Sequence, residues 1–416
     1  MSTTYKILAG DTFEIIARKE YGTELKASLI SNANPGIVEP LSAGTTLTIP
    51  VDPIAPTDKI QDAPADNEDE VAILIDGVRF RFWDKVTINR TVDAMDMVNF
   101  TAPFDGDEPA FRETFRPFAY KPVVITLGGT VLFTGTMVSP VPSIAERRKI
   151  LSVSCYSSPG VLGDCPPPAS IKNLEQLEFN EQTLKAIATS LAALFGIGVQ
   201  FDSSPGPVFD RVAIKSTRKV LEFLIELAKQ RNLIVTSSNE GALLFKQGAV
   251  PGNPVATLLQ GSAPVLTVTP NFDPQNFYSH VTAVAPASLG VTGEPFTVKN
   301  PHLDGVLRPF TFTVPDTIEG GTKAAAESKA GRMFAGMVTY DVAVSTWRDA
   351  AGDLWEPGTT LRLHAHDAMI YSNYEFEIRS VAFSREPDSK TTVLTLIIPG
   401  ALAGKIPEAL PWDEDE

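Results

Sequence analysis

The chain has 416 residues, of which 43% are hydrophobic, enough to build roughly two to four compact domains. Its formal charge of −15 lies mainly in two short segments, since residues 53–70 and 406–416 each carry a net charge of −5. No clustered basic face is visible, and this disfavours nucleic-acid binding, which requires neutralisation of phosphates.

The two cysteines and the N-terminus indicate the compartment. Cys155 and Cys165 form neither a disulfide framework nor a CxxC metal motif, which favours a reducing environment. Residues 1–6 lack the basic start of a secretory signal, and no apolar run approaches the ~18 residues that a membrane span needs. We therefore expect a soluble protein made in the cytoplasm, with no cofactor.

Residues 5–50 are predicted to form a strand, two helices and a closing strand. The chain turns at a Gly-Asp-Thr sequence, where either Asp11 or Thr12 can cap a helix whose inner face carries Phe13, Ile16 and Ala17. A second short helix is expected over residues 25–31.

This segment resembles a LysM domain, through its GDT turn, an Ile-Ala pair in the first helix, an N-x-N-P segment and a closing G-x-x-L-x-I-P. The resemblance implies a domain over residues 1–52 and two binding loops. The loops contain Gly10, Asp11, Thr12, Phe13, Asn32, Asn34 and Pro35. LysM domains often bind N-acetylglucosamine chains, whereas similar modules in phage tail proteins often dock proteins. The second loop has no aromatic residue to stack on a sugar, which favours docking over possible peptidoglycan binding.

An acidic, flexible linker is predicted over residues 53–70, where Pro, Ala and Asp dominate. Residues 71–165 then alternate as short strands, with a strong hairpin signal at Asp76-Gly77. Many short strands with glycine turns predict a small barrel-like β-module or a strongly twisted sheet.

Residues 166–250 are predicted to be an inserted α+β unit. Asn180 is expected to cap a helix over 181–195 that Gly196 ends, and Ser216 or Thr217 to begin a second amphipathic helix. A hairpin follows.

A second barrel-like β-module is expected over residues 251–402, interrupted by a helix near 322–337. An acidic tail over 403–416 is expected to remain solvated. The predicted fold class is therefore mixed and β-rich, an α+β multidomain protein with two small β-barrel-like modules, an inserted α+β unit and a βααβ LysM module.

The two β-modules share a hairpin pattern at an offset of 243 residues. Apolar type is kept at five aligned pairs: Phe133 and Phe376, Val138 and Val381, Ile150 and Val393, Leu151 and Leu394, Val153 and Leu396. This predicts a duplicated module, although any two amphipathic hairpins alternate with period two. Duplication favours assembly over chemistry, because three such chains present six similar surfaces.

Candidate chemistry is weak. His364 and His366 alternate on a predicted strand beside Asp367 but lack a third metal ligand. Cys155 lies on an alternating strand where a buried small side chain is the ordinary interpretation, so pairing with His280 as a hydrolase is disfavoured. Core or interface packing is also favoured for the aromatic residues Trp347, Trp355 and Phe310. We expect no catalytic or metal site and no enzyme activity.

From Val71 to Pro399 the order of segments resembles Mu-like baseplate hub proteins of contractile phage tails, which are related in fold to late control protein D and to the hub half of type VI spikes. The resemblance is carried by VLFTGTMVSPVPS, NEQTLKAIATSLAALFGIGV, TRKVLEFLIELAKQRNLIV, DLWEPGTTLRL and FEIRSVAFSREPDSKTTVLTLIIP.

The resemblance implies a structural homotrimer whose two modules form a pseudo-sixfold ring, joining the sixfold tail tube to the threefold central spike. Tail tube protein, spike protein and baseplate wedge or tape-measure components are then the partners, and the location is the virion tail baseplate, assembled in the bacterial cytoplasm. An alternative is a LysM-targeted peptidoglycan-binding protein or cell-wall hydrolase.

Overall fold

The computed structural model describes residues 3–8, 10–21, 27–37, 40–49, 70–145, 148–168, 177–231, 233–247, 252–285, 295–314 and 321–413. The predicted linker over 53–70, apart from Glu70, lies outside the described residues, as do the last three residues of the acidic tail.

The N-terminal segment folds as a strand, two helices and a strand, as predicted. These are β1 (Thr3–Lys6), α1 (Phe13–Tyr21), α2 (Ala27–Ala33) and β2 (Thr46–Ile49), with β1 and β2 antiparallel. Its separate core is small and apolar: Ile7, Phe13, Ile16, Ala17, Ile30, Leu47 and Ile49.

The centre of the molecule is one continuous 13-stranded sheet. The first module contributes β3 (Val71–Ile75), β4 (Val78–Phe80), β5 (Lys85–Thr91), β6 (Met97–Pro103), β7 (Pro122–Leu127), β8 (Thr130–Ala145) and β9 (Arg148–Ser157), with α4 (Pro109–Thr114) between β6 and β7. The second module contributes β15 (Thr257–Leu259), β16 (Val265–Phe272), β20 (Val338–Val344), β21 (Thr360–Ala365), β22 (Ile370–Glu386) and β23 (Ser389–Ile397), with the short 3-10 helix η5 (His366–Ala368) after β21.

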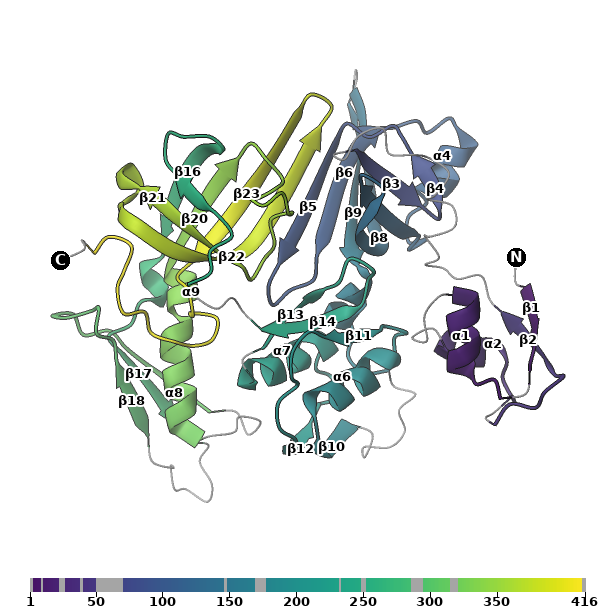
Figure 1. The fold of residues 1–416 in the computed structure, drawn as a ribbon, viewed down its shortest axis with the longest axis horizontal. Coiled ribbons are helices and arrows are strands. Elements are labelled where there is room, and N and C mark those ends of the chain that lie inside the picture. The colour runs from purple at the N-terminus through teal and green to yellow at the C-terminus, as the bar shows by residue number, and fades with distance from the viewer. Residues whose placement is uncertain are drawn as a thin grey trace.

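The strands follow the order β16-β20-β23-β22-β5-β6-β9-β8-β7-β3-β4, and β21 and β15 extend from β22 beside this path. Figure 1 shows the two modules side by side, joined where β22 meets β5. The β-rich fold class is as predicted, but the described strands form no closed barrel, because the strand path ends at β16 on one side and at β4 on the other without joining. The predicted turn at Asp76-Gly77 is confirmed, with φ of 53° and 75°.

The inserted α+β unit has a hydrophobic core of its own, formed between two helices and a small sheet. Its elements are η2 (Ser158–Gly160), α5 (Val161–Asp164), β10 (Glu178–Gln182), α6 (Leu184–Ala193), β11 (Val199–Phe201), β12 (Phe209–Ala213), α7 (Val220–Gln230), β13 (Leu233–Ser237) and β14 (Leu243–Gln247). Ile187 and Leu191 of α6 are buried in this core, as are Leu224 and Leu227 of α7.

The predicted hairpin of this unit is confirmed as β13 and β14, which pair in antiparallel fashion. The sequence did not indicate β11, which adds to the hairpin by parallel pairing with β14.

Two predicted helix starts in this unit are wrong. Asn180 lies in β10, opposite Arg211 of β12, because residues 178–182 pair as a strand before the helix begins. The cap of α6 is Thr183, whose hydroxyl accepts a hydrogen bond from the amide of Ala186 (3.3 Å). Helix α7 begins at Val220 after Lys219, so neither Ser216 nor Thr217 caps it.

A second excursion leaves the sheet between β16 and β20. It consists of η4 (Pro274–Asn276), β17 (His280–Val284), β18 (Phe296–Lys299), β19 (Pro309–Thr313), α8 (Gly321–Arg332) and α9 (Phe334–Met337). The excursion and the α+β unit both lie below the large sheet in the view of Figure 1, on the same side of the two modules. The two β-modules therefore lie on one side and these two additions on the other.

The C-terminal tail differs from the expectation that it is solvated. Up to Asp413 it packs on the second module, with Leu410 buried and the indole of Trp412 against Phe272 (ring centroids 5.7 Å apart). The hydroxyl of Tyr374 donates to the carbonyl of Ala409 (2.8 Å). Apolar residues within the tail outweigh its acidic composition, because their burial is favourable.

Candidate assembly interface

The junction between the two modules is an antiparallel ladder between β22 and β5. Its register runs from Ser380 opposite Thr91 to Arg385 opposite Val86, and the amide of Val92 continues it by donating to the carbonyl of Arg379 (3.1 Å). Hydrogen-bonded pairs alternate along an antiparallel ladder, so odd-numbered residues of β22 direct their backbone groups toward β5. The modules are thus joined through the main chain.

The β8–β9 and β22–β23 hairpins have the same register throughout. Met137 faces Cys155 as Ile378 faces Leu396, and the ladder shifts by one residue directly after both pairs. Each hairpin also closes with two residues between its last pairs, Ala145–Arg148 and Glu386–Ser389 in the two modules. The structural offset is 241 residues, two fewer than the sequence pattern indicated.

The flanking strands repeat as well. β7 pairs with β8 as β21 pairs with β22, and β6 pairs with β9 as β20 pairs with β23. The chain order β5, β6, β7, β8, β9 matches β16, β20, β21, β22, β23, and the spatial order 5-6-9-8-7 matches 16-20-23-22-21. The two modules therefore share strand order and register, and their long hairpins share one register shift, although β3 is antiparallel to β7 and β15 is parallel to β21.

Two edges of this repeated unit have no ladder among the described residues. The outer half of β8, residues 139–145, pairs with β9 alone, whereas the matching half of β22 also pairs with β5. Among the described strands, β16, the counterpart of β5, pairs with β20 alone. Exposed apolar side chains lie on both edges: Val141 and Ile144 on β8, Leu266 and Phe272 on β16. The sequence analysis did not predict these two open edges.

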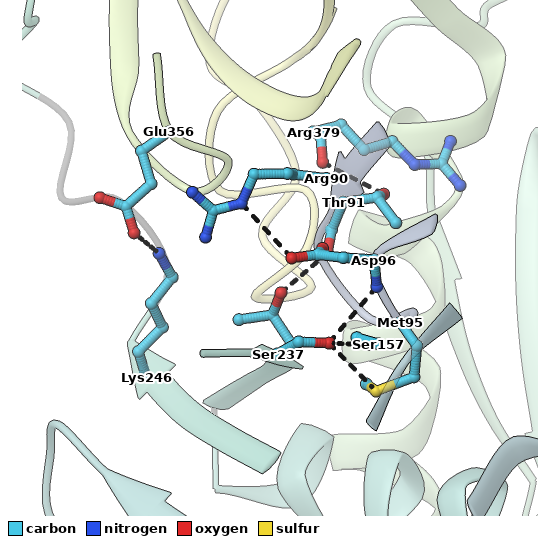
Figure 2. A network of polar contacts seen from close by, with 10 residues as sticks. Arg90, Thr91, Met95, Asp96, Ser157, Ser237, Lys246, Glu356 and Arg379 are labelled. Carbon is cyan, nitrogen blue, oxygen red and sulfur yellow. Dashed lines mark hydrogen bonds and ion pairs between the residues drawn. The ribbon is translucent and has the colours of Figure 1, made fainter. Parts of the chain in front are cut away.

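A buried polar network ties the α+β unit to the first module (Figure 2). The carboxylate of Asp96 lies 3.4 Å from the Arg90 guanidinium, and the Asp96 amide donates to the Ser237 hydroxyl (3.4 Å). Ser237 in turn contacts the hydroxyl of Ser157 (2.5 Å). Burial raises the pKa of Asp96 to about 6, against the attraction of Arg90.

The second module holds the same unit through an ion pair at the surface. The ammonium of Lys246, on β14, lies 2.5 Å from the carboxylate of Glu356 (Figure 2). Nearby, Glu377 of β22 is 2% exposed, and burial raises its pKa to about 7. The α+β unit is therefore in contact with both modules at their junction.

The predicted binding loops of the N-terminal module are partly used for its own fold. Asp11 is buried, and its carboxylate accepts from the Leu8 amide (2.8 Å), the Tyr5 hydroxyl (2.9 Å) and the Lys19 ammonium (2.7 Å). The hydrogen bond from Lys19, more than the others, lowers the pKa of Asp11. Thr12 caps α1, with its hydroxyl accepting from the amide of Ile15 (3.3 Å).

Asn34 is likewise internal. Its side-chain amide donates to the carbonyls of Ile30 and Thr48 (both 2.7 Å), and its oxygen accepts from the Thr48 amide (2.7 Å), so it links α2 to β2. Phe13 is buried, whereas Gly10 and Pro35 are exposed and Asn32 is the penultimate residue of α2. The two loops expose backbone and small residues; Asp11, Phe13 and Asn34 face the interior.

The histidine pair does not share a strand. His364 lies near the end of β21, while His366 begins η5 and is exposed beside Asp367. Within the described ranges, no group of three or more His, Cys, Asp or Glu side chains is arranged to hold a metal ion.

Cys155 and His280 lie in different sheets, on β9 and β17. The thiol is buried in the core of the first module, which raises its pKa to about 12, and its counterpart in the second module is Leu396. The predicted core role is confirmed for two aromatic residues, since Trp347 and Trp355 are 2% and 1% exposed. Phe310 is partly buried and stacks on Tyr278 (4.8 Å between centroids).

No helix in the part of the chain that the structure describes is both long enough and apolar enough to cross a membrane.

The fold is similar to those of two solved tail proteins. The 43 kDa tail protein of prophage MuSo2 from Shewanella oneidensis superposes with a TM-score of 0.66 at 23% identity, over 80% of this chain and 99% of that one. The tail protein from Neisseria meningitidis MC58 gives a TM-score of 0.65 at 20% identity, over 81% and 98% of the two chains.

Sequence comparison indicates which kind of tail protein this chain is similar to. Residues 160–247 match the family described as "Baseplate hub protein gp44-like, second domain". The baseplate hub protein gp44 of Escherichia phage Mu is 21% identical over 309 residues, which span 71% of this chain and 79% of gp44. Together these matches support a phage baseplate hub.

Proposed function

We propose that this protein is a structural hub of a contractile tail baseplate. In this role it forms a homotrimer whose six β-modules make a pseudo-sixfold ring. The ring joins a sixfold tail tube above to a threefold central spike below. It acts by assembly and carries out no catalysis.

The observation that carries this proposal is that the two modules have the same strand order, and that their long hairpins have the same register with the same register shift. A sixfold partner requires six similar surfaces, and three chains with two equivalent modules each provide them. The joined pair β22–β5 supplies one contact of the ring within each chain, and the unpaired edges of β8 and β16 are available for the contacts between chains.

The placement of the additions supports the second half of the proposal. The α+β unit and the β17–α8 excursion lie on the same side of both modules (Figure 1). Three copies therefore leave one face of the ring to similar modules, which suits the tube. The opposite face carries threefold additions, which suits the spike.

We further propose that residues 1–52 form a LysM-like module that docks protein components such as wedge or tape-measure proteins. Support comes from the burial of Asp11, Phe13 and Asn34, which keeps these three side chains of the predicted loops from contacting a sugar. The exposed apolar side chains of Leu8 and Ile15 flank the first loop and suit a protein partner.

Electron microscopy of concentrated protein, with mass measurement by analytical ultracentrifugation, tests the ring. We expect a closed trimer with a six-lobed outline. A monomer at every accessible concentration, a twofold-symmetric dimer or open chains of increasing length would contradict the proposal. The clearing of a peptidoglycan suspension would contradict the non-enzymatic role.

A further inference from the structure

The internal β22–β5 junction provides a template for a contact between two copies. When the two modules are superposed, β8 takes the place of β22 and β16 takes the place of β5. Each residue of β8 then matches the residue of β22 that is 241 positions later, and each residue of β5 matches the residue of β16 that is 182 positions later. Applied to the register of the internal junction, these offsets set Pro140 opposite Phe272, Pro142 opposite Pro270 and Ile144 opposite Val268.

We propose that the outer half of β8 pairs in antiparallel fashion with β16 of a second copy in this register, with about half the backbone hydrogen bonds of the equivalent internal pairs. The inference rests on the proposed ring and specifies its contact between chains.

The smaller number of hydrogen bonds follows from which residues direct their backbone groups toward the second copy. Odd-numbered residues of β22 bond to β5, and the odd offset makes the outward positions of β8 even: Pro140, Pro142 and Ile144. On β16 the Asp273 amide donates to Met337, toward the interior, so Val268, Pro270 and Phe272 face outward. Three of these six positions are proline, which has no N–H to donate.

Each hydrogen-bonded pair of an antiparallel ladder exchanges two bonds, so the prolines remove three of the six that these pairs would make. At the internal junction the same positions hold Val381, Phe383 and Arg385 opposite Arg90, Ile88 and Val86, all of which have an N–H donor. Prolines on an edge strand commonly prevent uncontrolled strand addition. Here they leave a complete pair of bonds only near the hairpin tip, at Ile144 and Val268.

At the other end of the contact, near Phe272, apolar packing compensates for the hydrogen bonds that the prolines cannot make. A cavity of about 500 Å³ lies beside the end of β16, lined by Phe272, Pro274, Phe277, Met337, Met369 and Trp412. In the inferred register Pro140 of the second copy faces Phe272, which lines this cavity. Proline side chains can bury apolar surface there although they donate no hydrogen bond.

A disulfide test measures the register directly. Hydrogen-bonded antiparallel pairs have Cα atoms about 5.5 Å apart, within disulfide reach. The variant Ile144→Cys with Val268→Cys is expected to form interchain disulfides and to run as covalent oligomers up to a trimer in non-reducing electrophoresis. The matched control, Val86→Cys with Arg385→Cys, places the same pair at the internal junction and is expected to oxidise without a change in mass.

The outcomes separate the register from the ring. If the control oxidises and the Ile144/Val268 pair does not, while the trimer forms, the inferred register is wrong and the ring stands. If the pair crosslinks into open chains beyond a trimer, the register holds and the ring fails. If no oligomer forms at any concentration, both fail.

Restoring the missing donors gives a second measurement. Pro142→Thr combined with Pro270→Thr is expected to lower the dissociation constant of the contact by roughly tenfold, from restored hydrogen bonds. Val141→Thr, whose amide faces β9, is the control and is expected to leave it within about twofold. An unchanged dissociation constant in the double variant would overturn the role assigned to the prolines.

Discussion

The first and second modules have the same strands in the same register, yet the equivalent edge strands differ in their pairing. In the second module the outer half of β22 is joined to β5 by a full ladder, whereas the outer half of β8 in the first is unpaired on that side within the described residues. The same backbone therefore supports a permanent contact in one place and an available one in the other.

The modules also fill equivalent space with different side chains. Between β20 and β21 the second module buries Trp347, whose indole donates to the carbonyls of Ser384 and Thr391 (3.3 and 3.1 Å). Between β6 and β7 the first module instead uses a cluster of phenylalanines, with Phe111 and Phe115 4.7 Å apart. Conservation of register does not require conservation of packing.

The largest expected effect comes from removing the tryptophan that supports the β22–β23 hairpin. Trp347→Ala is expected to lower the free energy of unfolding by about 3–5 kcal/mol, because it leaves a cavity and removes the single indole N–H that Ser384 and Thr391 share. Denaturant unfolding measures it, and hydrogen exchange should show faster opening of β22–β23 than of β8–β9. Trp412→Ala, in the partly buried tail, is the control. An equal loss of unfolding free energy in both variants would contradict a special role for Trp347.

A pH effect should distinguish the modules, because Glu377 of β22 corresponds to Thr136 of β8. Burial raises the pKa of Glu377 to about 7, so the folded state favours the protonated acid. Its stabilising contribution is full below about pH 4.5 and is lost as the pH rises through about 7.

Glu377→Gln should remove this loss and raise the free energy of unfolding above pH 7 by about 1–3 kcal/mol. A titration of stability against pH measures it, and the dependence that remains near pH 6 belongs to Asp96. Glu386→Gln, on the half-exposed end of the same strand, is the control and should leave the pH profile unchanged. A flat profile in the wild-type protein would contradict the assignment.

The joined and unpaired edges can be compared by one substitution at matched positions. Arg385→Pro removes a donor from the internal ladder and is expected to cost about 1–2 kcal/mol of stability. Ile144→Pro, at the corresponding place on β8, should leave monomer stability within about 0.5 kcal/mol and weaken association. Thermal unfolding together with sedimentation measures both, and a destabilised monomer in the Ile144 variant would show that this edge of β8 is already paired.

The smallest effect is expected at the surface of the junction. Lys85 and Glu386 form an ion pair across the two modules at 2.9 Å, with each side chain about half exposed. Glu386→Ala should reduce stability by about 0.2–0.5 kcal/mol at low salt and by less at high salt. A loss of several times that size would mean that the pair, and not the ladder, holds the modules together.

Much of the fold was predictable, because alternating strands and glycine turns are local signals. These local signals predicted the Asp76-Gly77 turn, the β13–β14 hairpin and the order of elements in the N-terminal module. The duplicated hairpin was also recognised, but two residues out of register. A shift of two keeps every inward residue inward, so the apolar pattern could not distinguish an offset of 243 from one of 241.

The remaining features depend on contacts between distant segments. Asn180 has the chemistry of a helix cap, but pairing with β12 placed it in a strand instead. Asp96 and Glu377 carry no sequence signal of burial, since their environment is made by strands far along the chain. The open edge of β8 had one available signal, the alternation of Pro140 and Pro142 with polar and apolar neighbours, which is typical of an edge strand.

One strand has a mechanical role in this architecture. β22 is hydrogen-bonded to β21 along its first part, to β5 along its last part and to β23 along most of its length. A force that acts on either module therefore reaches the other through the backbone hydrogen bonds of the β22–β5 ladder. The pair should tilt or shift as a single stiff plate.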